Sequence, residues 1–211
     1  MGTVRDFVKE NLLKADRENI FNVQFELLRY LEENEPLPTW LEVKIDSIVK
    51  KGFNRSYIIA SAISNEIAAI PLAKKANRQR VPEISQLMYL SKVRGLNIKK
   101  LPDSGPSAVR LLNGEFSYGT KIINSTKSID AINGSDFISL KYVQESGGAQ
   151  DNQVYDVGLF LKEAVCYTNK YDNDIKFTAI VDGGYIESKI PELRKDTNSR
   201  VRVFTSDSYN Y

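Results

Sequence analysis

The hydrophobic pattern of this chain changes near Leu101, and no other feature restricts its possible folds as strongly. Before this point apolar residues recur with helical spacing, so that Ile20, Val23 and Leu27 would share one helix face. After it, apolar residues come in short runs separated by turn residues such as Asn133-Gly134. The change predicts an α/β (α+β) protein, with a helical N-terminal half packed on a central mixed sheet.

The N-terminal half contains five segments with helical spacing. A chain of 211 residues fits a single domain, residues 1–211, in which we expect a helical subregion at 1–55 and a core at 56–205. Thr39 and Glu42 match a capping box for the third helix, and Gly52 follows it. The helices are expected at residues 3–15, 19–33, 39–51, 56–70 and 82–95.

The C-terminal half contains short apolar runs and one further helix. Two pairs of runs predict hairpins, and Gly147-Gly148 leads into a helix with Val157 and Leu161 on its apolar face. Two single strands follow. The expected hairpins are residues 107–112 with 116–123 and 129–132 with 137–143, and the single strands are 175–181 and 201–204.

Residue usage excludes several kinds of chemistry. The chain has no histidine, and Cys166 is its only cysteine. Ser-His-Asp and Cys-His catalysis, zinc sites built from Cys and His, and disulfides within the chain are therefore excluded. Hydrolysis would depend on carboxylates, lysine and an oxygen-binding ion such as Mg²⁺. No signal peptide and no long apolar window are present, so we expect a cytoplasmic protein without a membrane partner.

Positive charge is concentrated in one part of the chain. The net charge is only +2, but residues 44–100 hold twelve Lys or Arg against three Asp or Glu, a local net of +9. Such a surface suits a polyanion, and nucleic acid is the expected partner. Arg, Asn and Gln side chains match base edges, and Lys suits phosphates. One basic run and one amide-rich segment are therefore the candidate DNA-binding segments. The candidates are Lys74, Lys75, Asn77, Arg78, Gln79 and Arg80, with Gln150, Asn152 and Gln153.

The second hairpin brings an aspartate and a lysine to one face. If Gly134 and Ser135 form a two-residue type II′ turn, Asp130 faces Ser139. Alternation then puts Lys141 on the same face as Asp130, at a diagonal backbone distance of roughly 7–8 Å. Such a pair can hold a metal ion and a nucleophilic water between its members.

Two other interpretations of these residues exist. A same-face Asp and Lys on a hairpin is often a solvated ion pair, with about 0.2–1 kcal/mol of stabilisation. Ser139 and Lys141 could also form a Ser-Lys hydrolase pair, although neighbouring same-face positions rarely give the geometry needed.

The order of helix, strands, Asp–Lys hairpin, helix and strand resembles the PD-(D/E)xK nuclease superfamily, and within it the type II restriction endonucleases. The resemblance covers about residues 56–182 and includes the run GGAQDNQVYD, followed by the strand KFTAIVDGGY. It implies a restriction-endonuclease-like αβββαβ core, in which Asp130 is a metal ligand and Lys141 a catalytic residue.

The chain departs from the family pattern at two positions. Ile129 stands where the family has proline, and Ser139 stands where it has the acid two residues before the lysine. Some restriction endonucleases have Ser-x-Lys on this strand and take the second carboxylate from elsewhere. Asp156 on the next helix, Glu145 at the end of the strand and Glu66 on an earlier helix are the candidates. A helical wheel puts Asp156 away from the apolar face.

The resemblance implies a type II restriction endonuclease that hydrolyses double-stranded DNA with Mg²⁺. It further implies a homodimer cutting a palindrome and a cognate DNA methyltransferase as functional partner. The alternative is a sequence-specific DNA-binding protein with a degenerate, non-catalytic nuclease fold, which Ser139 favours.

Overall fold

The computed structural model describes residues 2–75 and 80–210. The chain forms two compact units, one of Met1–Val8 with Pro82–Tyr211 and one of Lys9–Val81. The fold is mixed α/β, as the hydrophobic pattern predicts, with helices concentrated before Leu101 and strands after it. In the described residues no helix combines the length and the apolar character needed to cross a membrane.

The Lys9–Val81 unit is helical and has its own apolar core. Its first helix is continuous, whereas two helices were expected at 3–15 and 19–33. The segment between them, Asp16-Arg17-Glu18, does not end the helix, because none of its residues is a glycine or a proline. The elements are α1 (Val4–Glu32), whose residues before Lys9 belong to the other unit, α2 (Thr39–Val49), α3 (Arg55–Ser64), α4 (Glu66–Ala69) and a 3₁₀ turn (Ile70–Leu72). The core consists of Val23, Leu27, Leu41, Ile45, Ile58, Ile59, Ala62, Ala69, Leu72 and Ala73.

Two expectations for this unit are wrong. The boundary expected at residues 55–56 stays a prediction, and residues of α1, α2 and α3 on both sides of it share one core. Thr39 is the first helical residue of α2, after Pro38, so it makes no capping bond. The helix expected at 56–70 is interrupted at Asn65, whose side chain accepts a 2.8 Å hydrogen bond from Ile67 N and so begins α4.

The other unit contains a five-stranded mixed sheet in the order β1-β4-β5-β6-β7. The pairs β1–β4 and β4–β5 are antiparallel, and β5–β6 and β6–β7 are parallel. The strands are β1 (Lys99–Lys100), β4 (Ala131–Asn133), β5 (Asp136–Tyr142), β6 (Lys176–Asp182) and β7 (Val201–Phe204). The sheet confirms both predicted single strands, at slightly shifted bounds.

A separate two-stranded sheet stands between β1 and β4 in the sequence. The strands β2 (Val109–Leu112) and β3 (Glu115–Tyr118) pair antiparallel across Asn113-Gly114, as predicted. Both turn residues have positive φ, +53° and +67°, which is typical of a type I′ turn. Glu163 accepts a 2.7 Å hydrogen bond from Gly114 N, so this hairpin lies against the long helix after β5.

Each face of the main sheet is covered by a different element. The helix α6 (Gly148–Lys170) runs along one face and shares its core with β5, β6 and β7. The second face carries α5 (Val81–Met88), a π-helical turn (Tyr89–Val93) and the C-terminal tail, whose Tyr209 is fully buried. Between β6 and β7 lie α7 (Gly184–Glu187), α8 (Ile190–Leu193) and a 3₁₀ turn (Arg194–Asp196).

Candidate active site

The β4–β5 hairpin has the register predicted from its turn. Ala131 pairs with Ile138, and Asn133 pairs with Asp136. Gly134 has a φ of +59°, which the first position of a type II′ turn requires. The paired register ends at Ala131, and Asp130 N donates a 3.0 Å hydrogen bond to Ile138 O, so the expected pairing of Asp130 with Ser139 does not form.

Asp130 and Lys141 are both bound to the backbone of Leu140. Asp130 Oδ2 accepts a 2.8 Å hydrogen bond from Leu140 N, and Lys141 Nζ donates a 2.9 Å hydrogen bond to Leu140 O. The N–H and C=O of one strand residue point to the same side, so the carboxylate and the ammonium group lie along one edge of β5. Standard bond lengths limit their separation to about 10 Å.

The end of β4 explains why these side chains reach Leu140. Continued pairing would place Ile129 opposite Leu140, but Ile129 N instead donates a 2.8 Å hydrogen bond to Val109 O of β2. The backbone of Leu140 is thereby left without a strand partner on this side. The carboxylate and the ammonium group take the place of the missing strand, since buried backbone groups need hydrogen-bond partners.

The three central residues are nearly buried. Asp130 is 4% exposed, Lys141 7% and Ser139 8%. A lysine is seldom buried to this degree without a partner, so a solvated surface ion pair does not describe this pair. In the part of the chain that the structure describes, Ser139 and Lys141 share no hydrogen bond, which leaves a Ser-Lys hydrolase without support.

The candidate second acids lie in different surroundings. Asp156 Oδ2 on α6 is 2.5 Å from the Nζ of Lys127, a residue that precedes Asp130 by three positions. The Asp156 side chain is only 18% exposed. It therefore does not face solvent, although its helix position suggested this. Glu145 is exposed in the loop before α6, and Glu66 is exposed at the start of α4 in the helical unit. The structure does not place either beside Asp130, and their roles stay predictions.

The carboxylates around Asp130 can be tested against the needs of Mg²⁺. Within residues 2–75 and 80–210 no three His, Cys, Asp or Glu side chains converge on a point that could hold a metal ion. Mg²⁺ keeps several waters and is commonly bound by one or two carboxylates together with substrate phosphates. Asp130 is one such carboxylate, and Asp156 on α6 would supply a second only by releasing Lys127.

The predicted DNA contacts are only partly described. Lys74 and Lys75 are exposed, and Lys74 Nζ lies 4.6 Å from the centre of the Trp40 ring. Arg80 has a φ of +61°, which is unusual for a residue other than glycine. Asn77, Arg78 and Gln79 lie outside the described residues.

The amide residues of α6 are at its N-terminal end. Gln150 and Gln153 are half-buried, and Asn152 is exposed. Gln150 N donates a 2.9 Å hydrogen bond to Gly147 O, so the glycine turn leads directly into the helix, as expected. Asn152 is thus the amide of this group most open to a ligand.

Two buried carboxylates on the other face of the sheet, Asp136 and Asp182, were not predicted as site residues. Asp182 at the end of β6 accepts hydrogen bonds from Ser206 N (2.9 Å), Ser206 Oγ (2.5 Å) and Gln86 Nε2 (2.6 Å). Burial raises the pKa of Asp182, and the hydrogen bonds from Ser206 and Gln86 oppose that rise.

Gln86 connects this carboxylate to the lysine strand. Its Nε2 also donates a 3.1 Å hydrogen bond to Lys141 O, so one side chain of α5 holds the ends of β5 and β6 together. The sequence signal was an acid ending an apolar strand. This signal does not identify the hydrogen-bond partners of Asp182, because Gln86 and Ser206 are distant from it in the sequence.

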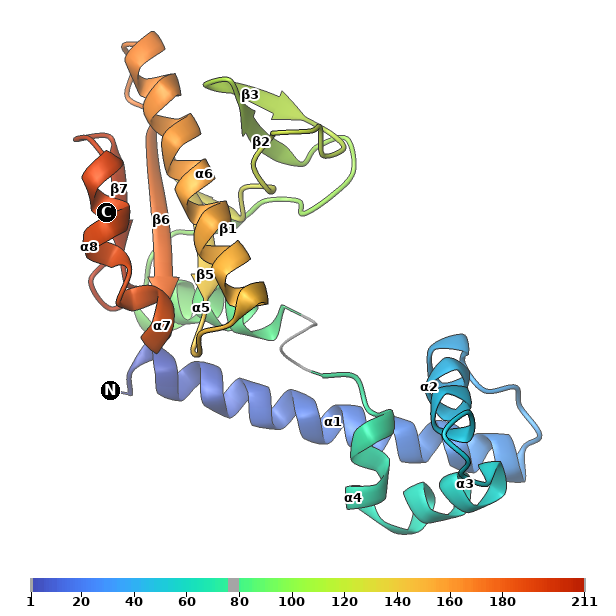
Figure 1. Cartoon of the computed structure of the whole chain (residues 1–211). Helices are drawn as coiled ribbons and strands as arrows, with labels where there is room; N and C mark the ends of the chain where they lie inside the picture. Colours follow the sequence, from blue (N-terminus) through green and yellow to red (C-terminus); the bar gives the residue numbers. More distant parts are fainter. Residues whose placement is uncertain (1, 76–79, 211) are drawn as a thin grey trace. The chain divides into compact units, whose positions relative to one another are not determined.

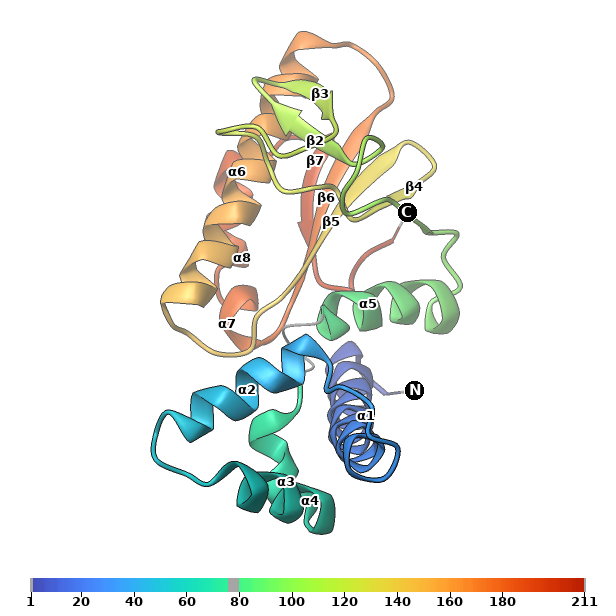
Figure 2. The same cartoon turned by 90° about the vertical axis from the view of Figure 1, so that its right-hand side faces the viewer.

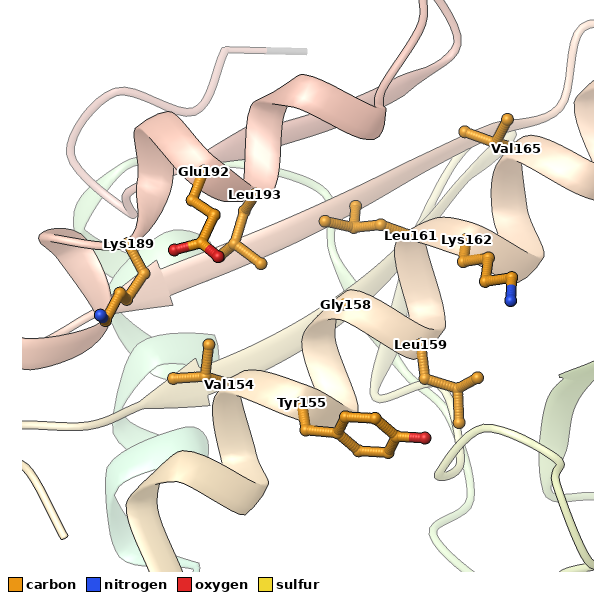
Figure 3. Close-up of a pocket in the computed structure, with 10 residues that line it drawn as sticks. All are labelled: Val154, Tyr155, Gly158, Leu159, Leu161, Lys162, Val165, Lys189, Glu192 and Leu193. Atoms are coloured by element: carbon orange, nitrogen blue, oxygen red, sulfur yellow. The ribbon is translucent and has the colours of Figure 1, made fainter. Parts of the chain in front are cut away.

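A cavity of about 650 Å³ lies away from the Asp130–Lys141 pair, between α6 and α8. Figure 3 shows mostly apolar side chains around it, with Lys162, Lys189 and Glu192 among them. No predicted site residue lines it, so it adds nothing to the proposed chemistry.

No protein-family model, curated protein or solved structure matches this chain, so the assignment of a function depends on the geometry described above.

Proposed function

We propose that this protein is a Mg²⁺-dependent endonuclease that hydrolyses phosphodiester bonds of double-stranded DNA. The observation that carries the proposal is the anchoring of Asp130 and Lys141 to the backbone of Leu140. It holds a negative and a positive group on one edge of a rigid strand, in a poorly solvated place where electrostatic interactions are stronger than in water.

The element order supports the proposal. Around the pair run α5, β1, β4, β5, α6 and β6, which is the αβββαβ order that the sequence resemblance implies, with the β2–β3 hairpin inserted after β1. A shared architecture alone is a weak argument for function. The proposal therefore depends on the side chains of the hairpin.

The two charged residues would have different tasks. The carboxylate of Asp130, with that of Asp156, would hold Mg²⁺, which when bound neutralises the phosphate and makes a bound water more acidic. Lys141 would leave Leu140 O to orient the attacking water and to stabilise the negative charge that develops on the phosphate oxygens. The Leu140 N–H keeps Asp130 in place during this exchange.

The basic segments would supply the grip on DNA. Lys74 and Lys75 suit phosphates, while Arg80 and the amides at the start of α6 suit base edges. Neutralised phosphates release counterions, so binding should weaken steeply as salt concentration rises. A restriction role would further imply a homodimer and a protecting DNA methyltransferase.

Plasmid digestion tests the proposal. Supercoiled plasmid with Mg²⁺ should give discrete fragments, and Lys141→Ala should reduce the rate by about 100- to 1,000-fold, the usual cost of one group that stabilises the transition state. Lys162→Ala is the control, because Lys162 is an exposed lysine on α6. Equal activity of the wild type and Lys141→Ala would refute the role of Lys141.

The second candidate is a DNA-binding protein without catalysis. It is favoured by Ser139 at the position of the family acid and by the engagement of Asp156 with Lys127. A gel shift that falls with added salt, together with plasmid that stays intact at every Mg²⁺ concentration, would support this candidate over the nuclease.

A further inference from the structure

The long helix α1 has a second apolar face opposite its buried one. Val23 and Leu27 are fully buried in the core of the helical unit, whereas Phe21 is 66%, Phe25 49% and Leu28 38% exposed. The exposed three are spaced i, i+4 and i+7, so they form one continuous stripe. The Phe21 and Phe25 rings stack with their centres 6.5 Å apart.

Exposed aromatic stripes of this kind mark interaction surfaces. Two phenylalanines and a leucine on neighbouring turns leave a contiguous apolar area in water. A hollow of about 410 Å³, lined by Arg17, Glu18, Phe21 and Asn22, adjoins the stripe. The stripe thus offers both a ridge and a depression to a partner helix.

The stripe is flanked by opposite charges in a symmetric arrangement. Arg17 precedes Phe21 by four residues, and Glu32 follows Leu28 by four residues. Both are exposed, and in the described part of the chain neither has an ion-pair partner. Two copies of the stripe that run in opposite directions place Arg17 of one against Glu32 of the other, and the exposed Glu18 lies beside Arg17 at the same end.

We propose that α1 pairs with α1 of a second copy of this chain in an antiparallel, two-fold symmetric contact. Arg17 of one copy then faces Glu32 of the other, and Phe21 faces Leu28, each contact occurring twice. A parallel pair would instead place Arg17 beside Arg17 and Glu32 beside Glu32. The charges therefore select the antiparallel arrangement.

The contact is about four helical turns long, roughly 22 Å, and each phenylalanine offers about 150–250 Å² at most. Such an area lies at the small end of specific interfaces, so a weak dimer that dissociates on dilution is expected. The proposal does not depend on nuclease activity, and its test does not involve DNA.

Sedimentation velocity of the full-length protein over a range of concentrations tests the proposal. The wild type should show a monomer–dimer equilibrium, and Phe21→Ser with Phe25→Ser should weaken it about tenfold or more. Phe53→Ser is the matched control, because Phe53 is 56% exposed but lies outside α1. A monomer at every concentration, or a dimer that the α1 variant leaves unchanged, would overturn the proposal.

A charge exchange tests the antiparallel pairing itself. Arg17→Glu and Glu32→Arg should each weaken the dimer, since each puts like charges together at two places. The double variant should recover the wild-type dissociation constant to within about threefold, and Lys51→Glu, an exposed charge off this helix, should leave it unchanged. A double variant no better than either single one would contradict the arrangement.

Discussion

Asp136 and Arg202 form an ion pair inside the sheet, with Arg202 Nη2 2.7 Å from Asp136 Oδ2. Asp136 is fully buried at the start of β5, and the Arg202 side chain on β7 is 23% exposed. Thr178 Oγ1 and Tyr209 OH also donate to this carboxylate. One aspartate thereby joins three strands and the C-terminal tail.

This ion pair gives a stability prediction. Arg202→Met removes the only cation bound to Asp136 among the described residues and should lower the free energy of unfolding by about 3 kcal/mol, because a buried charge loses its partner. Adding Asp136→Asn should recover more than half of that loss. Urea unfolding of the three proteins measures both effects, and an additive double variant would show that the residues do not interact.

Asp182 should give the protein a measurable pH dependence. Burial raises its pKa above the ordinary 3.8, so the folded state binds this proton more tightly than the unfolded state. The contribution of Asp182 to stability therefore falls as pH rises from about 3.8 through its folded pKa. Across this range the wild type should lose stability relative to Asp182→Asn as pH increases. Urea unfolding of both proteins measures this difference. A constant difference would mean that the pKa of Asp182 is not raised.

Asp130→Asn separates charge from shape at the candidate site. Asparagine keeps an oxygen that can accept the hydrogen bond from Leu140 N, so the fold should lose no more than about 1 kcal/mol. Cleavage should fall about 100-fold or more, because the negative charge that would hold Mg²⁺ is gone. Plasmid digestion and urea unfolding of the same preparation test this, and retained cleavage would exclude Asp130 as a metal ligand.

Lys127→Met should free Asp156 for a metal ion. Lys127 is about half-exposed, so its ion pair with Asp156 contributes little to stability, about 0–1 kcal/mol. The Mg²⁺ concentration for half-maximal cleavage should then fall several-fold. Adding Asp156→Asn should abolish that gain; an unchanged Mg²⁺ requirement in Lys127→Met would remove Asp156 from the proposed metal site.

Gly183→Ala should be among the most damaging small substitutions. Gly183 has a φ of +102°, and a Cβ there would lie 2.5 Å from Val143 O. Backbone must move to admit it, so a loss of about 3 kcal/mol or more is expected. Gly119→Ala is the control: its φ is +94°, but a Cβ would meet nothing within 4 Å, so only the conformational cost of about 1 kcal/mol applies. Equal losses in urea unfolding would contradict the steric argument.

Much of the candidate site could be predicted from local sequence. The turn Gly134-Ser135 sets the register of the hairpin, and the two-residue period of a strand then places Ser139 and Lys141 on one face. Helix and strand types followed from hydrophobic period in the same way. The interruption at Asn65 and the continuity of α1 were missed, although both have local causes: the Asn65 side chain caps α4, and residues 16–18 include no glycine or proline.

By itself, the sequence determined the mixed α/β class, the register of the Asp130 hairpin and the exclusion of histidine chemistry, because these depend on residue types and short-range spacing. Only the tertiary structure decided that Ile129 pairs with Val109, that Asp156 binds Lys127, and that Tyr209 fills the core beside Asp136. Each of these contacts joins segments distant in sequence. Buried polar and charged groups at these positions are paired with the groups that the fold brings near. The sequence around each residue does not contain that information.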